Sequence, residues 1–214
     1  MTLRTSVILC ALTVALYGGV AAAQSAPRHS PLDKPSRKDL VEPPANPPKP
    51  QRGDRTHNLD FLFGALKAAP DDVSAKHIED RIWALWLVSG SDTCNLLMTR
   101  VKAAIDGENY DLAIHLLDAI IEVRPNYVEA WNRRASVFFL EHDYGSAIAD
   151  LRQVLKREPR HFGALAGLGS ILQDIGDDKD ALEVYRRALA VHPHLNGVAE
   201  KVKLLTDKVE GRAI

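Results

Sequence analysis

Residues 128–161 read VEAWNRRASVFFLEHDYGSAIADLRQVLKREPRH, and this stretch predicts two amphipathic helices joined by a short turn. Trp131, Ala135 and Phe138 are spaced as one face of a helix. Neither helix can bury its apolar stripe alone, so the two are expected to pack on each other and on neighbours of the same kind. The second stripe follows the turn at 142–144 and consists of Ala147, Ile148, Leu151, Val154 and Leu155.

The same pattern recurs along the chain with a fixed period. Pro125, Pro159 and Pro193 are 34 residues apart, and proline at a regular interval ends helices. Several registers keep this period, which chance does not explain, and they predict helix pairs at 94–127, 128–161 and 162–195. The other series are Ala113, Ala147 and Ala181; Ile114, Ile148 and Leu182; Ile121, Leu155 and Leu189; and Asn109, Asp143 and Asp177.

Residues 94–195 resemble the tetratricopeptide repeat, whose pattern places Trp, Leu-Gly, Ala and Pro at set positions of two helices. The middle repeat matches best and the first one least. The resemblance implies an all-α fold, a right-handed α-solenoid of antiparallel helix pairs with three repeats and flanking helices. The matching residues of the middle repeat are Trp131, Ala135, Phe138, Ala147, Leu151 and Pro159.

Segments on both sides of the repeats are expected to complete this solenoid. Residues 57–93 predict a degenerate helical pair, and the run 82–88 is apolar almost all round, so its helix should lie between neighbours. Residues 196–214 predict a half-polar capping helix. The charged face of that cap argues against stacking of a second copy there, whereas the upstream end near Leu59 and Phe63 stays open to such stacking.

Composition narrows the classes of function. The chain has 214 residues with 27 Lys+Arg, 28 Asp+Glu and a formal net charge of −1, and this balance argues against a nucleic-acid partner. Two cysteines exclude a disulfide scaffold and a thiolate-rich metal site. Cys94 is expected to be a buried free thiol.

The first 23 residues have the layout of a secretory signal, with an apolar run after Arg4 and a cleavage site before Gln24. The alternative is an uncleaved anchor that tethers the protein to a membrane. Residues 24–56 hold eight of the twelve prolines and are expected to be a disordered linker, either a spacer or a docking segment. The protein is therefore expected to be exported, periplasmic or membrane-anchored facing the periplasm, with no integral membrane domain once the signal is cleaved.

The resemblance also implies where a ligand would bind, since tetratricopeptide solenoids hold a peptide or protein segment on the concave face formed by first helices. Helix geometry selects the face adjacent to the packing stripe. The small residues of the third repeat permit either a hollow for a ligand or tight helix packing, and both interpretations stay open. The candidate groove residues are Met98, Lys102, Asn132, Arg133, Ser136, Phe139, Leu140, Gly163, Ala166 and Ser170.

Chaperone-binding members of the family hold a terminal carboxylate with Lys and Asn at set positions of successive first helices. The corresponding positions here are Met98, Lys102, Arg133, Gly163 and Gly167, so that clamp is not supported. Arg100 and Arg134 stand where the family has an apolar residue. They either hold an acidic ligand group, or they extend into solvent or pair with acids such as Asp118 and Asp150.

The remaining chemistry-bearing residues give little signal. His161 and the pair His192 and His194 invite a metal hypothesis, but no carboxylate or thiolate joins them at ligand spacing, so they are expected to be scattered surface histidines. No phosphate loop, nucleophile elbow or zinc-protease motif occurs. We expect a non-enzymatic adaptor without a cofactor that binds a protein segment; the alternatives are a self-association module and a small-ligand or metal-binding protein.

Overall fold

The computed structural model describes residues 52–211, and the predicted signal sequence and most of the Pro-rich linker lie outside them. Within this range the chain forms nine helices and no strand, which confirms the predicted all-α class. The helices are α1 (Arg52–Lys67), α2 (Asp72–Leu87), α3 (Asp92–Asp106), α4 (Tyr110–Val123), α5 (Val128–Leu140), α6 (Tyr144–Arg157), α7 (Phe162–Asp174), α8 (Asp178–Val191) and α9 (Val198–Val209). In this described part, no helix is long and apolar enough to cross a bilayer.

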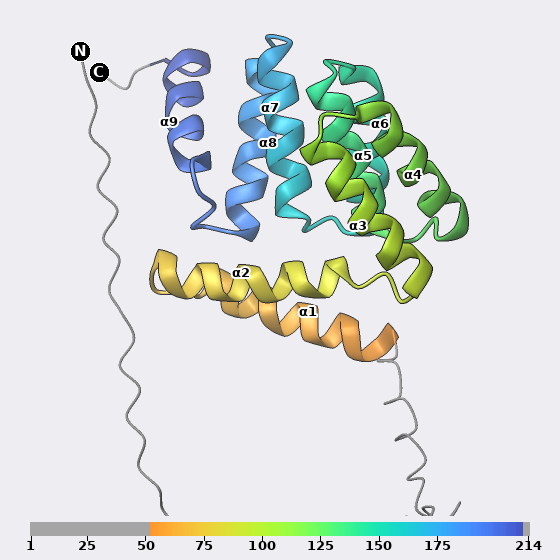
Figure 1. Ribbon diagram of the computed structural model, residues 1–214. Coiled ribbons are helices and arrows are strands. Elements are labelled where there is room, and N and C mark those ends of the chain that lie inside the picture. The colour runs from red at the N-terminus through yellow and green to blue at the C-terminus, as the bar shows by residue number, and fades with distance from the viewer. Residues whose placement is uncertain (1–51, 212–214) are drawn as a thin grey trace, which may run out of the picture. The chain divides into compact units, whose positions relative to one another are not determined.

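Six of the helices form three stacked hairpins. α3 packs on α4, α5 on α6 and α7 on α8, and each hairpin packs on the next (Figure 1). α9 packs on α8. The side chains of Leu117, Val154 and Tyr185 are fully buried between these helices.

The start of each second helix explains one of the periodic series. The side chains of Asn109, Asp143 and Asp177 are the N-caps of α4, α6 and α8. Each Oδ1 accepts a hydrogen bond from the backbone N–H three residues further on, with N–O distances of 3.2, 3.1 and 3.2 Å respectively. These caps satisfy backbone donors that have no partner inside a helix, so the turn of every repeat needs a short acid or amide there.

The pair α1–α2 does not continue the stack. It runs across the ends of the repeat helices, where α1 packs on α8 and α2 packs on α5 (Figure 1). The expectation that this pair extends the solenoid at its upstream end is therefore wrong. α1 also begins at Arg52, inside the range predicted as linker.

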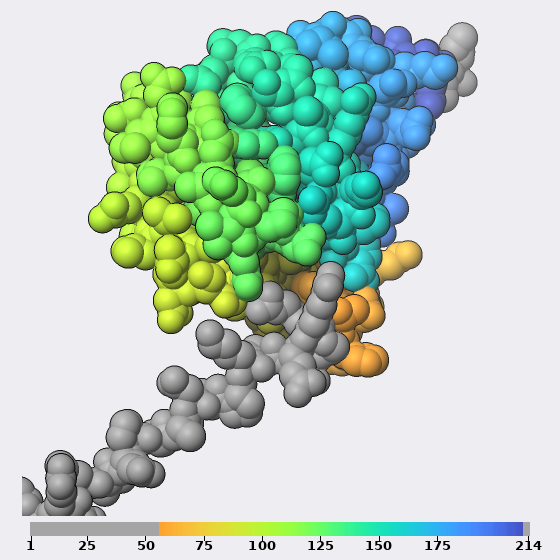
Figure 2. Space-filling view, turned by 90° about the vertical axis from the view of Figure 1, so that its right-hand side faces the viewer, coloured from red at the N-terminus to blue at the C-terminus, as the bar shows by residue number. Residues whose placement is uncertain are grey.

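The pair lies along the edge where the proline-bearing loops between repeats emerge. In the space-filling view, α1 (orange) lies below the green and teal repeat helices (Figure 2). The hydroxyl of Tyr127 donates to the carbonyl oxygen of Leu87 at 2.8 Å, and Arg160 Nη1 lies 2.7 Å from Asp60 Oδ1. One hairpin thus ties together loops that are distant in the sequence.

An aromatic cluster fills the space between α2 and the third repeat. Trp86 stacks on His161, and Phe162 packs edge-on against Trp83 with 5.6 Å between ring centroids. Phe162 is 1% exposed, because α2 covers it. This packing accounts for Ile82, Trp83 and Trp86 of the apolar run at 82–88, whereas Ala84, Leu87 and Val88 are exposed.

Leu59 and Phe63 belong to the same buried cluster. Their side chains are 9% and 7% exposed, since they pack in the core that α1 shares with α2. The expectation that these residues leave the upstream end open to a second copy is wrong. Cys94 is buried and free, as predicted.

Candidate functional site

A hollow opens between α5 and α7 on the face formed by the first helices. It has a volume of about 140 Å³. Five of the predicted groove residues line it: Asn132, Ser136, Phe139, Gly163 and Ser170. The other lining residues are Ala135, Leu151, Gly167 and Ile171.

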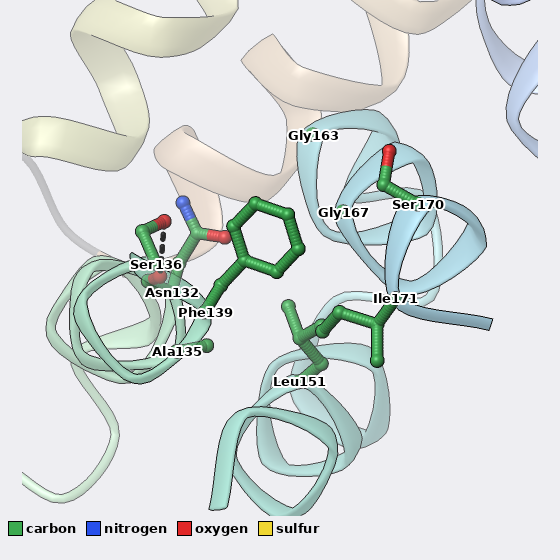
Figure 3. Close-up of a pocket in the computed structure, with 9 residues that line it drawn as sticks. All are labelled: Asn132, Ala135, Ser136, Phe139, Leu151, Gly163, Gly167, Ser170 and Ile171. Atoms are coloured by element: carbon green, nitrogen blue, oxygen red, sulfur yellow. Dashed lines mark hydrogen bonds between the residues drawn. The ribbon is translucent and has the colours of Figure 1, made fainter. Parts of the chain in front are cut away.

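The hollow has an apolar floor and one aromatic wall. Phe139 extends from α5 toward α7, while Leu151 of α6 and Ile171 of α7 lie beneath it (Figure 3). Leu151 and Ile171 are buried, and Phe139 is half-buried. A side chain that enters the hollow therefore exchanges water for an apolar surface.

The glycines of α7 have different surroundings. A Cβ at Gly167 would meet only Leu151, at 4.0 Å, which leaves this position open to the hollow. A Cβ at Gly169 would lie 2.6 Å from the Tyr185 ring, so this glycine permits tight packing of α7 on α8. Gly163 also lines the hollow, but a Cβ there would lie 2.9 Å from the Trp83 ring, so the missing side chain of this glycine makes room for Trp83.

Glu129 is a buried acid behind the polar rim of the hollow. Its side chain is 0% exposed, and its two carboxylate oxygens accept hydrogen bonds from Asn132 Nδ2 at 2.9 and 3.1 Å. Burial raises the pKa of the Glu129 carboxyl to about 7, against the lowering effects of the Asn132 hydrogen bond and the Arg133 charge. No pattern in the sequence indicates this residue.

A second polar cluster lies behind Ser170. The ammonium group of Lys201 on α9 donates to Ser170 Oγ at 3.1 Å and to Tyr185 Oη at 3.0 Å. Ser170 Oγ and Tyr185 Oη are 3.0 Å apart, and Tyr185 also donates to Gln173 Oε1 at 3.3 Å. The Ser170 side chain is therefore held in place at the rim of the hollow by Tyr185 and Lys201.

The other predicted groove residues do not line the hollow. Met98 packs against the core of the first repeat, and Ala166 packs in the core between α7, α8 and α9. Lys102 is exposed and pairs with Asp106 on its own helix. Leu140 is 46% exposed near the end of α5, and Arg133 is half-buried with its charge near Glu129.

Arg134 is occupied by two carboxylates of this chain. Its Nε and Nη2 atoms donate to Asp150 at 2.7 and 2.8 Å, and its Nη1 atom pairs with Asp118. Asp150 is 4% exposed, so this pairing keeps a buried charge neutralised. The sequence alone leaves two alternatives for Arg134, an acidic ligand group or a pairing with Asp118 and Asp150, and the structure has the pairing. Arg100, in contrast, is exposed on α3.

The expectation that the histidines are scattered over the surface is wrong for two of them. His161 and His192 are 0% and 1% exposed, because α2 covers the loops that carry them. His161 Nδ1 accepts the Ala164 backbone N–H at 3.0 Å and caps α7. His192 Nε2 lies 3.2 Å from Glu79 Oε2. Among the described residues, no three His, Cys, Asp or Glu side chains are grouped to hold a metal ion.

The floor residues were missed as site residues because their pattern is that of the core. Leu151 belongs to the apolar stripe of the second helix, which predicts packing and nothing more. Ala135 lies likewise on the stripe of the first helix. The small residues of the third repeat, Gly167 among them, indicated a possible hollow, but they did not identify the apolar residues that form its floor.

Comparison with known proteins identifies the family. A profile described as tetratricopeptide repeat matches residues 98–148 and 141–194. A TPR repeat-containing protein of Rhizobium etli is 39% identical over 153 residues, which cover 72% of this chain and 75% of that protein. The chain belongs to the tetratricopeptide-repeat family. Cellulose synthase 2 operon protein C of Komagataeibacter xylinus is 29% identical over 134 residues, 62% of this chain but only 10% of that protein.

Solved tetratricopeptide-repeat structures share the fold. The first TPR of Spaghetti, bound to an HSP90 peptide, superposes with a TM-score of 0.53 at 17% identity, over 56% of this chain and 95% of that one. MamA protein superposes with a TM-score of 0.52 at 17% identity, over 74% of this chain and 84% of that one. At this identity the likeness concerns the fold alone.

The tetratricopeptide-repeat hollow of this chain lacks the cations that a carboxylate clamp needs. Of the five clamp positions, only Gly163 and Gly167 line the hollow, and neither has a side chain. Lys102 lies outside it and pairs with Asp106.

Proposed function

We propose that this chain is an interaction module that binds an extended segment of a partner protein in the hollow between α5 and α7. The observation that carries the proposal is an open hollow with an apolar floor and a polar rim, formed by successive first helices. An apolar cavity of roughly 150 Å³ can hold a benzene molecule. The hollow is therefore large enough for one apolar side chain of a ligand.

The residues around the hollow could contact both the backbone and the side chains of a bound peptide segment. Gly167 of α7 lets a ligand backbone approach closely, because it has no side chain and only Leu151 lies near the position of an added Cβ. Phe139 supplies an aromatic surface of the kind that concentrates binding energy in protein interfaces. Asn132, Ser136 and Ser170 add polar groups that can fix the direction of a bound chain.

The comparisons add support from the fold. The Spaghetti structure contains an HSP90 peptide, and another neighbour, at 17% identity with a TM-score of 0.50, is a complex of the TPR2B domain of yeast Sti1 with Hsp70. The same architecture therefore accommodates peptides in other proteins. Chaperone tails are not the ligand that we propose here, because the clamp positions carry different residues.

The proposed role is non-enzymatic and needs no cofactor. Every described residue that lines the hollow is apolar, an amide or a hydroxyl, and none is an acid, a base or a thiol. Such a lining provides shape and hydrogen bonds but no group for proton transfer at neutral pH.

We further propose that binding takes place outside the cytoplasm, in the periplasm. This rests on the signal-like residues 1–23 and the Pro-rich linker that follows them. The mass of the protein recovered from a periplasmic fraction tests it. A chain that begins at Gln24 supports export with cleavage, a membrane-bound chain of full length supports the anchor, and a cytoplasmic chain of full length contradicts both.

Filling the hollow is the sharpest test of the binding role. Gly167→Leu should place a side chain where only Leu151 is near, and it replaces glycine by a better helix former. The matched control is Gly64→Leu on α1, where nothing lies within 4 Å of the new Cβ. Partners are captured from cell envelope extract with the full chain, and the bound segment is mapped with overlapping synthetic peptides.

The expected result is a peptide whose affinity, measured by fluorescence anisotropy, falls about 100-fold with Gly167→Leu and stays unchanged with Gly64→Leu. The fold-change corresponds to the loss of one well-buried apolar anchor. A partner whose peptides bind both variants equally would show that the contact lies elsewhere on the molecule.

A further inference from the structure

We propose that the outer face of the first repeat binds a second copy of this chain, so that two copies pack around a two-fold axis with their first repeats in contact. This end face is formed by α3 and α4, and Figure 2 shows it in yellow-green. The hollow lies elsewhere, since its lining residues belong to α5, α6 and α7. The residues of the end face are Leu96 and Ala103 of α3, with Leu112, Leu116, Ala119 and Val123 of α4.

The later repeats bury the positions that the end face exposes. Leu96 is 58% exposed, whereas Ala130 and Ala164, its equivalents in the second and third repeats, are each 0% exposed. Ala130 packs in a core that α5 shares with α3 and α4, and Ala164 packs in a core that α7 shares with α5 and α6. Within residues 52–211 the first repeat has no preceding repeat, because α1–α2 crosses the ends of the stack instead of continuing it (Figure 1). Side chains that a preceding repeat would cover are therefore at the surface.

α4 has two apolar stripes, and the described part of the chain fully covers only one of them. Leu117 lies on the covered stripe and is 0% exposed. The other stripe has spacings of four, three and four residues, as in helices that pack along another helix. Leu112 and Val123 on this stripe are 46% and 62% exposed. The spacing therefore fits a helix of the second copy. The members of this stripe are Leu112, Leu116, Ala119 and Val123.

The opposite end of the stack has a different character. The exposed face of α9 carries Glu200, Lys203 and Asp207 around Leu204 (Figure 1). A polar terminal helix of this kind keeps a solenoid soluble. Head-to-tail stacking of two copies would bury these charges, whereas two end faces bring apolar side chains together. The end face therefore fits a second end face better than it fits α9.

The charges of the end face are complementary under two-fold symmetry. Arg100 lies within the end face, and its equivalent one repeat later, Arg134, pairs with Asp150 and with Asp118 of the preceding repeat. Among the described residues, Arg100 and Glu122 form no ion pair, and both are exposed. Around a two-fold axis, Arg100 of each copy meets acidic residues of the other, such as Glu122 beside the stripe of α4, and every contact occurs twice.

Sedimentation velocity of the full chain, at concentrations from about 1 to 300 μM, tests the proposal. Leu96→Lys and Val123→Lys each place a charge on the end face at a side chain that is already exposed, so the fold of one copy should not change. The matched control is Leu204→Lys, because Leu204 is 67% exposed at the other end of the stack. Circular dichroism checks that each variant is folded. Residues 1–51 are present in every protein compared, so the differences between variants measure the end face.

We expect the wild type to dimerise with a Kd of about 1–100 μM, because two helices from each copy make a small interface. Leu96→Lys and Val123→Lys should each raise this Kd about 100-fold, since the two-fold axis removes an apolar contact and introduces a charge twice. Leu204→Lys should leave the Kd unchanged.

Three results would overturn the proposal. The first is a wild type that stays monomeric at every concentration. The second is association that grows beyond the dimer and is weakened by Leu204→Lys as much as by Leu96→Lys, which describes head-to-tail stacking. The third is association that neither end-face variant weakens, which would place the contact elsewhere on the chain.

Discussion

Trp86 stacks face to face on His161, with 4.0 Å between ring centroids and 6° between ring planes. Trp86 belongs to α2, and His161 caps the first turn of α7. The contact therefore joins the crossing hairpin to the repeat that forms one wall of the hollow. Gly163 follows two residues later, and a Cβ on it would lie 2.9 Å from the Trp83 ring, so the same hairpin also packs against a residue that lines the hollow.

His161 should make stability depend on pH in the acid range. Burial lowers the pKa of His161 to about 3, whereas the unfolded chain has a histidine pKa near 6.5. The folded state therefore keeps the ring neutral, and its stability is complete above pH 6.5 and falls as the pH drops from there toward 3. At pH 5 the loss from this group is about 2 kcal/mol.

His161→Asn tests this, because asparagine can also cap a helix N-terminus. Urea unfolding at pH 7 and pH 5 should show a smaller acid loss for the variant than for the wild type. His77→Asn, at an exposed position of α2, is the control and should keep the wild-type difference. An equal acid loss in all three proteins would rule out a buried neutral His161.

The arrangement of the repeats could be predicted from the sequence because it is encoded by periodic residues. The prolines at 125, 159 and 193 fix where each pair ends, and the caps Asn109, Asp143 and Asp177 fix where each second helix begins. Each signal is local, so it needs no knowledge of tertiary contacts.

The position of α1–α2 could not be predicted in the same way. An apolar run such as 82–88 shows that a helix must be covered, but it does not identify the covering surface. That surface includes His161 and His192, which have the composition of solvent-exposed loop residues. Their burial depends on a contact between residues more than 70 positions apart in the sequence, such as Trp86 and His161.

Only the part of the candidate site that depends on local helix geometry could be predicted from the sequence. Asn132, Ser136 and Phe139 follow from helix geometry, since they adjoin the packing stripe on the same helix. Glu129 gave no such signal, because an acid in the first turn of a helix is ordinarily a solvated residue that interacts with the helix dipole. Only packing shows that it is buried behind Asn132.

Gly169 should tolerate no larger side chain. An added Cβ would lie 2.6 to 2.9 Å from three atoms of the Tyr185 ring, which is itself fully buried and cannot move aside without disturbing α8. Gly169→Ala is expected to lower the free energy of unfolding by about 1–3 kcal/mol. Chemical denaturation measures this change.

Gly64→Ala is the matched control, since this glycine is also within a helix but nothing lies within 4 Å of its added Cβ. Here the change should stabilise the protein by about 0.5–1 kcal/mol, because alanine favours the helix. If both variants moved in the same direction, close packing at Gly169 would not be the cause.

The titration of Glu129 should lower the free energy of unfolding as the pH rises. This pH dependence is opposite in sign to that of His161. Burial raises the Glu129 pKa from 4.5 to about 7, so the folded state holds a proton that the unfolded state releases between these values. Stability is then greatest below pH 4.5 for this group and is lost as the pH rises through 7. The cost above pH 7 is about 3 kcal/mol at most.

Glu129→Gln removes the titration while keeping an acceptor for Asn132. Its melting temperature should exceed that of the wild type at pH 8, and the difference should shrink toward pH 5. Glu141→Gln, at an exposed position beyond α5, should show no such trend. If the melting temperatures of the wild type and of Glu129→Gln changed with pH in the same way, the Glu129 carboxyl would not be desolvated.

Arg134 and Arg100 occupy equivalent positions one repeat apart, yet they should differ sharply when replaced by alanine. Arg134→Ala leaves the buried Asp150 carboxylate without its two hydrogen bonds, and it also removes the guanidinium that lies 5.0 Å from the Trp131 ring centroid. We expect a loss of about 3 kcal/mol in the free energy of unfolding, as for other buried ion pairs with one partner removed.

Arg100→Ala concerns an exposed side chain and should change stability by less than about 0.5 kcal/mol. The double variant Arg134→Ala with Asp150→Ala should recover part of the loss, because no unpaired charge then remains buried. Ligand peptides mapped to the hollow should bind Arg134→Ala as tightly as they bind the wild type wherever the variant is folded, since Arg134 does not line it. A variant with wild-type stability and lost peptide binding would instead assign Arg134 to the ligand and remove its structural role.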